Sequence, residues 1–249
     1  MQELEKFYEK NKQVIEKMGI DKVLKESTEQ WWKAIDSYEY EYHFEWMGRP
    51  IIQTPQDIVA MQELIWHVKP DLIIETGIAR GGSLIFYSSI LELLGNGGEV
   101  LGIDIDIREH NRIEIEKHPM FKNITMFEGN AVSADMVNKV KEFVKNKSKQ
   151  RIMLILDSNH THEHVLKELE LYSDFVKKGS YLIVFDTVIE DFIEKSCSNQ
   201  NRPWGKGNNP KTAVWEFLQS NKRFEVDKAI QNKLVITVAP DGYLKCTKD

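Results

Sequence analysis

Residues 71–83 read DLIIETGIARGGS, and this stretch decides the fold of the 249-residue chain. Its apolar run ends in Glu75 and predicts a buried strand, while Gly77, Gly81 and Gly82 predict a tight turn. A helical pattern begins directly after the turn. A strand, a glycine turn and a helix in this order bring backbone N–H groups and a helix N-terminus together, which favours binding of a nucleotide-like ligand.

Outside this stretch, short apolar runs alternate with amphipathic helical patterns. Strands are predicted for LIIE at 72–75, EVLGIDI at 99–105, NITMFEG at 123–129, RIMLILD at 151–157, SYLIVFD at 180–186, FEVD at 224–227 and KLVITVAP at 233–240. Helices are predicted at 55–68, 82–94, 109–117, 134–146, 162–176 and 210–220. This alternation predicts an α/β fold in which helices cover both faces of a mainly parallel sheet. Only a few residues separate FEVD from KLVITV, so we expect these two strands to pair antiparallel as a hairpin.

The first fifty residues have a different pattern. Apolar side chains from Leu4 to Met18 recur at helical spacing, so we expect an amphipathic helix, a break at Gly19 and a second helix. The run SYEYEYHFEW at 37–46 then alternates aromatic and acidic residues. These aromatic side chains either pack on the core, form a wall or lid of the substrate site, or make a contact in a homo-oligomer. We divide the chain into a helical appendage, residues 1–50, and a main domain, residues 51–249.

Composition places the chain among soluble globular proteins. Hydrophobic residues make up 41% and charged residues 29% of the sequence, and the net charge is −6, which argues against binding to nucleic acid or to a membrane surface. Cys197 and Cys246 indicate neither a disulfide framework nor a cysteine metal site. The start of the chain carries no apolar signal core, and no apolar run approaches the ~20 residues of a membrane span. We therefore expect a cytoplasmic protein.

Polar side chains end five successive predicted strands. They are Glu75, Asp104, Asn130, Asp157 and Asp186. In an open α/β sheet the ligand lies beyond the carboxyl ends of the strands, so these side chains are expected to converge. Asp104 ends the second strand, where an acid accepts hydrogen bonds from the ribose hydroxyls of an adenosine-containing cofactor. Both NAD and S-adenosyl-L-methionine contain this ribose.

The glycine turn distinguishes these two cofactors. A dinucleotide fingerprint, GxGxxG, brings a glycine backbone against a pyrophosphate, but this turn reads GIARGG and has Ala79 and Arg80 where close approach is needed. S-adenosyl-L-methionine has no pyrophosphate. Ser83, the turn amides and Arg80 are suited to hold the carboxylate of its methionine part. The turn therefore argues against an NAD-dependent oxidoreductase.

Several motifs resemble one protein family. ETGIARGGS, followed by GIDID, EGN, LDSNH and a strand ending in Asp186, is similar to the family that groups cephalosporin hydroxylase-like proteins with rhamnosyl and macrolide-sugar O-methyltransferases. WMGRP, TPQD, RPWGKGNNPKTAVWEFL, FEVD and DGYLK carry the same resemblance, which covers about residues 43–245. The resemblance implies a Rossmann-like class I methyltransferase fold. Its sheet has seven mainly parallel strands with one antiparallel strand, and residues 51–249 form the methyltransferase domain.

The resemblance also implies an activity. Members of this family are S-adenosylmethionine-dependent O-methyltransferases, often with a divalent metal such as Mg²⁺, that act on a hydroxyl group of a small polar acceptor. We expect a sugar or a glycosylated metabolite as the acceptor. The expected donor-binding residues are Glu75, Gly77, Arg80, Gly81, Ser83, Asp104, Asn130 and Asp157.

Methyl transfer to a hydroxyl group needs a base beside the methyl group. Related metal-dependent O-methyltransferases resemble this chain in having a ligand Asp with a basic residue three positions later. We therefore expect Asp157 to be a metal ligand and His160 to be the general base, although His160 is also placed to cap the helix that follows. Asp186 is the expected second ligand of Mg²⁺.

One position departs from the family pattern. Phe185 stands where relatives carry the first of two adjacent acids, so Glu190, Asp191 or substrate would have to complete the metal site. The same departure motivates an alternative, a catalytically inactive SAM-binding or assembly protein.

Two further segments leave alternatives open. HTHEH at 160–164 is partly similar to a hydrolase zinc motif, but on a helix only the first and last histidines share a face. The loop 190–210 is long enough to be functional, and Trp204 in it either stacks on a sugar ring, closes over the donor or anchors the loop on the core.

Overall fold

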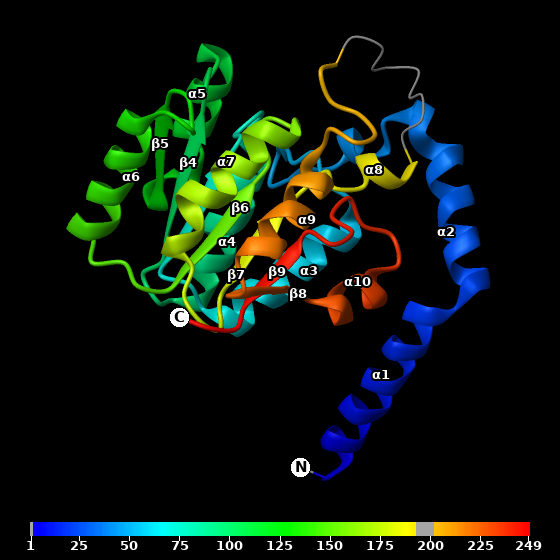
Figure 1. Cartoon of the computed structure of the whole chain (residues 1–249). Coiled ribbons are helices and arrows are strands. Elements are labelled where there is room, and N and C mark those ends of the chain that lie inside the picture. The colour runs from blue at the N-terminus through cyan, green and yellow to red at the C-terminus, as the bar shows by residue number, and fades with distance from the viewer. Residues whose placement is uncertain (1, 193–201) are drawn as a thin grey trace.

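The computed structural model describes residues 2–192 and 202–249, and at its centre is a seven-stranded sheet (Figure 1). The spatial order is β5-β4-β3-β6-β7-β9-β8. Among the described strands, β9 alone runs against the others, antiparallel to both β7 and β8. The strands are β3 (Leu72–Thr76), β4 (Glu99–Asp104), β5 (Ile124–Glu128), β6 (Ile152–Leu156), β7 (Tyr181–Val184), β8 (Phe224–Val226) and β9 (Tyr243–Cys246).

The order of the strands reverses beside β3. The chain passes outward from β3 to β4 and β5 and then returns to β6 on the other side of β3. Such a reversal leaves an opening at the carboxyl ends of the two central strands, where α/β proteins bind their ligands. The in-register pairing of Thr76 with Leu156 brings Gly77 and Asp157 side by side at this opening, and the Asp157 N–H donates to the Thr76 carbonyl at 2.9 Å.

Helices form a layer on each face of the sheet. Successive strand residues point to opposite faces, so Ile73 packs with one layer while Leu72 and Ile74 pack with the other. The first layer contains α3 (Pro55–Val68), α4 (Gly82–Leu94), α5 (Glu109–Glu116) and α10 (Lys228–Leu234), and the second contains α6 (Ala134–Asn146), α7 (His162–Tyr172) and α9 (Pro210–Ser220). No helix in residues 2–192 or 202–249 is long and apolar enough to cross a bilayer.

The N-terminal segment consists of α1 (Gln2–Ile20), α2 (Lys22–Ile35), two short 3₁₀ turns and a hairpin of β1 (Glu45–Trp46) and β2 (Arg49–Pro50). Figure 1 shows α1 extending away from the sheet, and none of its described residues is buried. The hairpin packs on the core, because the Trp46 indole N–H donates to Ser89 Oγ at 3.0 Å. The two predicted helices are therefore present, although the break follows Ile20 and not Gly19. The domain boundary at residue 50 stays a prediction.

The prediction of a strand over 233–240 is wrong. FEVD pairs with YLKC of β9, and the Asp227 side chain caps the unpredicted helix α10 by accepting from the Ala229 N–H at 3.2 Å. The apolar run after α10 is buried in irregular structure, where Asp57 of α3 supplies acceptors. Asp57 accepts from Thr237 Oγ1 at 2.5 Å and from the Val238 N–H at 2.9 Å. A side-chain carboxylate thus satisfies backbone and hydroxyl donors that a sheet would otherwise have to satisfy.

Candidate active site

A cavity of about 1120 Å³ lies at the carboxyl ends of the central strands. It extends from the glycine turn across the ends of β4 to β7 and reaches the N-terminal segment through Trp32, Ile35 and Tyr42. Eight of the predicted site residues line it: Gly77, Arg80, Ser83, Asp104, Asn130, Asp157, His160 and Asp186. Glu75 and Gly81 do not. The rule that strand-end side chains converge therefore holds for four of the five positions.

The glycine turn is shaped by close backbone contacts. At Gly77, whose φ is +91°, a Cβ atom would lie 2.1 Å from the Asp157 carbonyl oxygen, and at Gly82 it would lie 2.2 Å from that of Pro50. The Arg49 side chain donates to the Arg80 carbonyl, with its Nε at 3.1 Å. These close backbone contacts leave no room for a side chain at Gly77 or Gly82.

Glu75 lies behind this turn. Its side chain is 1% exposed and accepts a hydrogen bond from Ser83 Oγ at 2.7 Å. Burial raises the pKa of Glu75 to about 8, although hydrogen bonds from Ser83 and Tyr87 oppose this rise. In this structure the carboxyl group orients Ser83, and Ser83 is the residue that lines the cavity.

Asp104 ties β4 to the turn. Its Oδ2 accepts from the Ile78 N–H at 2.7 Å and from the Ala79 N–H at 3.3 Å, and its Oδ1 accepts from the Asp106 N–H at 3.1 Å. Because the Oδ1 atom uses one lone pair in these contacts, it keeps a further lone pair for a hydroxyl group in the cavity. Asn130 lines the cavity beyond β5, and its Oδ1 accepts from the Val132 N–H at 3.1 Å.

Asp157, His160 and Asp186 form a compact cluster on the cavity wall. One ligand atom of each lies within 4.8 Å of the other two, and His160 Nε2 is 3.2 Å from Asp186 Oδ2. The pKa of Asp157 lies well above its ordinary value because of burial, and next because of the negative charges of Asp186 and Glu75. A divalent cation among these groups would relieve that repulsion, and carboxylate oxygens are the ligands that Mg²⁺ prefers. The residues present therefore fit such an ion.

Asp186 has an unusual backbone. Its φ of +56° lies in the left-handed region, which is rare for residues other than glycine and is often found at functional sites. The Phe185 N–H donates to the Leu156 carbonyl at 3.0 Å, and the Ile189 N–H donates to the Asp186 carbonyl at 3.2 Å. Phe185 itself is 1% exposed and packs in the core, so it contributes no polar atom to the cluster.

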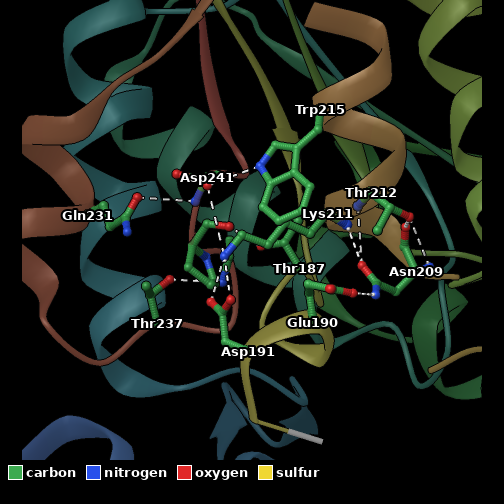
Figure 2. Close-up of polar contacts among 12 residues, drawn as sticks. Thr187, Glu190, Asp191, Asn209, Lys211, Thr212, Trp215, Gln231, Thr237 and Asp241 are labelled. Atoms are coloured by element: carbon green, nitrogen blue, oxygen red, sulfur yellow. Dashed lines mark hydrogen bonds and ion pairs between the residues drawn. The ribbon is translucent and has the colours of Figure 1, made fainter. Parts of the chain in front are cut away.

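Glu190 and Asp191, which the sequence offered as further ligands, are engaged elsewhere. They lie on the short helix α8 (Ile189–Phe192) and contact the start of α9, as Figure 2 shows. Glu190 accepts from Asn209 Nδ2 at 2.5 Å, and Asp191 pairs with Lys211 Nζ at 2.6 Å. Neither acid belongs to the cluster among the described residues.

The ring of His160 contacts Asp186 and Trp204, although its position in the sequence also suits a helix cap. The N-cap of α7 is Thr161, and the Thr161 N–H is satisfied by Asn159 Oδ1 at 2.9 Å. The centroids of His160 and Trp204 are 4.9 Å apart in an edge-to-face arrangement, and Trp204 also lines the cavity. The part of the 190–210 loop that contains Cys197 lies outside the described residues.

The remaining histidines of HTHEH point to different partners. His162 contacts Thr212 Oγ1 at 2.8 Å and Glu216 Oε2 at 3.2 Å, whereas His164 Nε2 lies 3.5 Å from Glu168 Oε1. Within the described residues, the three imidazoles therefore share no metal site.

Sequence reasoning missed two residues that support the site. Gln53 donates from Nε2 to Asp157 Oδ2 at 3.3 Å, and Arg49 supports the glycine turn. Both precede α3, and although Arg49 lies in the WMGRP motif, neither position indicates a contact with the distant strand ends. For the aromatic run at 37–46 a wall of the substrate site was one of several alternatives, and Tyr42 of this run lines the cavity.

Comparison with known proteins finds one matching family and several relatives of this chain. The family model described as "Rhamnosyl O-methyltransferase/CmcI" matches residues 38–247. A rhamnosyl O-methyltransferase of Mycobacterium leprae (strain TN) is 26% identical over 231 residues, which cover 86% of this chain and 92% of the relative.

Solved structures share the fold. The apo structure of CmcI-N160 is 18% identical and covers 84% of this chain and 78% of its own, with a TM-score of 0.59. The structure of cmcI-D160 with Mg and SAM has the same identity and TM-score and covers 83% of this chain and 77% of its own.

Proposed function

The chain belongs to the rhamnosyl O-methyltransferase/CmcI family, and from this premise we propose that it transfers the methyl group of S-adenosylmethionine to a hydroxyl group of a small polar acceptor. The acceptor we propose is a sugar or a glycosylated metabolite, because the curated relative is a rhamnosyl O-methyltransferase. The observation that carries the proposal is the cluster of Asp157, His160 and Asp186 beside the glycine turn in one cavity.

The donor end of the proposed site lies at the glycine turn. The Ile78 and Ala79 amides are engaged by Asp104, so we propose that the backbone N–H groups of Gly82 and Ser83, at the start of α4 on the cavity wall, bind the carboxylate of the methionine part. Asp104 is placed to accept from the ribose hydroxyls. Arg80 lines the same cavity and adds a positive charge beside the carboxylate. Bound there, the donor supplies an electrophilic methyl group.

The chemical step is assigned to the cluster. Asp157 and Asp186 would hold Mg²⁺, which supplies a positive charge that makes a nearby hydroxyl group more acidic. His160 Nε2 faces the cluster and accepts the proton of the acceptor hydroxyl, while the adjacent Asp186 carboxylate stabilises the imidazolium that forms. Trp204 contacts the imidazole ring in an edge-to-face arrangement.

The donor assignment is tested by calorimetry with S-adenosylhomocysteine, the demethylated product. Asp104→Ala removes the carboxylate that faces the ribose, so we expect affinity to fall at least tenfold, which corresponds to about 1.4 kcal/mol. Asp106→Ala is the matched control, because that side chain lies two residues away and pairs only with exposed Arg108 among the described residues. Equal affinity of the wild type and Asp104→Ala would contradict the assignment.

The alternative function is binding of the donor without methyl transfer. Phe185 is buried where relatives have an acid, which favours a protein that binds the donor and performs no transfer. Turnover of a panel of sugar acceptors with and without Mg²⁺ distinguishes the two functions. Donor binding without any methylated product would favour the alternative.

A further inference from the structure

Glu190 connects two segments that meet at the proposed site. It lies on α8, four residues after Asp186, and Figure 2 shows its carboxylate directed towards Asn209 at the start of α9. Glu190 Oε2 accepts from the Gly207 N–H at 2.7 Å and from Asn209 Nδ2 at 2.5 Å. A carboxylate that receives two neutral donors forms charge-assisted hydrogen bonds, which are stronger than those between neutral groups.

These bonds hold a closed turn, residues 203–209, which we name the Trp204 turn. Gly205 and Asn208 exchange backbone hydrogen bonds of 3.0 Å, and Asn208 Nδ2 donates to the Pro203 carbonyl at 2.8 Å. Asn209 Nδ2 donates to the Gly205 carbonyl at 2.9 Å as well as to Glu190. The Trp204 turn is therefore one hydrogen-bonded unit, and Glu190 anchors it to α8.

The cap of α9 does not depend on Glu190. Asn209 caps the helix with its other side-chain atom, because its Oδ1 accepts from the Lys211 N–H at 2.9 Å and from the Thr212 N–H at 3.3 Å. The attachment of α8 to α9 has a separate basis in the ion pair of Asp191 with buried Lys211. Loss of the Glu190 carboxylate therefore leaves both helices anchored and removes only the attachment of the Trp204 turn to α8.

The Trp204 turn contacts the proposed base, His160. Trp204 lies against one side of the His160 ring, and Asp186 lies beside its Nε2 atom. Asn208 Oδ1 also accepts from the His162 N–H at 3.0 Å, two residues after His160. Contacts on two sides limit the rotation of the imidazole. A base whose orientation is fixed is more often in the geometry that removes the proton of the acceptor hydroxyl.

We propose that Glu190 is a positioning residue, which holds the Trp204 turn against His160 and thereby fixes the orientation of the ring. The role of His160 as a base rests on the proposed function. The placement of Trp204 by Glu190 does not depend on it.

The variants separate the hydrogen bonds from the charge. Glu190→Gln keeps an acceptor for both donors, whereas Glu190→Met has a similar length and no strong acceptor. Asn209→Asp retains the cap oxygen but places a second carboxylate against Glu190, and so disrupts the contact from the other side. Glu163→Met is the matched control, because Glu163 is an exposed acid of α7 that pairs with Lys167. Trp204→Leu provides the reference for a His160 ring without its aromatic neighbour.

Two measurements report the position of the turn without an acceptor. In NMR spectra we expect the His160 ring signal of Glu190→Met and Asn209→Asp to move towards that of Trp204→Leu, while Glu190→Gln and Glu163→Met stay with the wild type. In hydrogen exchange we expect the Gly207 amide to exchange at least about tenfold faster in Glu190→Met than in Glu190→Gln. A wild-type His160 signal and a protected Gly207 amide in Glu190→Met would overturn the inference.

Calorimetry on the same variants distinguishes failure of the proposed function from failure of the positioning role of Glu190. We expect Glu190→Met, Glu190→Gln, Asn209→Asp and Glu163→Met to bind S-adenosylhomocysteine with the wild-type affinity, because none of these three side chains lines the cavity that contains the proposed donor groups. Absence of binding by the wild type would overturn the proposed function, while the NMR signals would still decide whether Glu190 places Trp204. A uniform loss of affinity in Glu190→Met and Glu190→Gln alike would overturn the inference, since the charge and not the contact would then matter.

Discussion

Glu75 and Gly77 are neighbours on one strand end, yet different forces constrain them. The carboxyl group of Glu75 is withdrawn from water, and this raises its pKa, whereas Gly77 is constrained by the backbone of Asp157 beside it. The sequence predicted that both residues belong to the site. It could not show that Glu75 orients Ser83 from behind, because the direction of a strand side chain depends on where the ligand cavity opens.

The raised pKa of Glu75 predicts a pH-dependent stability. Between its ordinary value of 4.5 and about 8, the folded protein binds this proton more tightly than the unfolded protein does. The free energy of unfolding should therefore fall as pH rises through this window, by at most about 1.4 kcal/mol per pH unit, and level off above it. Glu75→Gln keeps an acceptor for Ser83 and loses this contribution.

Denaturant titrations of the wild type and Glu75→Gln measure the effect. We expect the stability of the variant relative to the wild type to grow from about pH 5 to about pH 8. Parallel pH profiles of the two proteins would show that Glu75 ionises normally in the folded state.

Gly77→Ala tests the close approach of the glycine turn to the end of β6. The added Cβ atom would meet the Asp157 carbonyl oxygen, so the end of β6 must shift and carry the proposed metal ligand with it. We expect binding of S-adenosylhomocysteine to weaken at least about tenfold. Gly97→Ala is a suitable control, since its φ is also positive and a Cβ there would contact nothing within 4 Å. Wild-type affinity in Gly77→Ala would contradict the close approach.

At the scale of elements, the sequence predicted the bounds of four helices accurately. The predicted bounds of α3, α4, α6 and α9 agree with the structure, and Ser133 and Asn209 cap the last two of these helices. The strand predicted at 233–240 is wrong because the acceptors for that segment come from Asp57, about 180 positions earlier in the chain. A periodicity of apolar residues carries no information about such a distant partner.

Asp57 should therefore stabilise the C-terminal segment. It is fully buried and also accepts from Thr54 Oγ1 at 2.6 Å and from the Tyr243 hydroxyl at 2.6 Å. Asp57→Ala would leave several buried donors unpaired, so we expect a loss of about 3 kcal/mol or more in the free energy of unfolding. Chemical denaturation measures this loss, with Asp106→Ala, at an exposed acid, as the comparison. A change below about 1 kcal/mol would show that water replaces the carboxylate.

For the whole molecule, the seven-stranded sheet with one antiparallel strand among those described is the class I methyltransferase fold, as the sequence predicted. Topology alone brought Asp104, Asn130, Asp157 and Asp186 to one cavity, because parallel strands end at the same edge of a sheet. The contacts of Gln53, Arg49 and Glu190 depend on irregular segments and were not predictable from motifs. A homo-oligomer stays a prediction. The exposed apolar side chains of Leu4, Phe7 and Tyr8 on α1 are compatible with a subunit contact.

The metal assignment also belongs to this scale, because its ligands come from two strands. Asp157→Asn and Asp186→Asn each remove one negative charge, so we expect binding of Mn²⁺, used as a spectroscopic substitute for Mg²⁺, to weaken at least about tenfold in both. Electron paramagnetic resonance of free Mn²⁺ measures this binding. Asp174→Asn, on an exposed acid, is the control. Equal Mn²⁺ binding in the wild type and both variants would place the metal elsewhere.

The most direct test of the central claim is mass-spectrometric detection of methyl transfer from a donor with a deuterated methyl group to a panel of sugar acceptors. For the wild type we predict a labelled product. For His160→Ala we predict a loss of about a hundredfold or more in turnover, with unchanged affinity for S-adenosylhomocysteine, because only the proton acceptor is removed. Wild-type turnover in His160→Ala would contradict the account of His160, and donor binding with no labelled product from the wild type would contradict methyl transfer to a sugar.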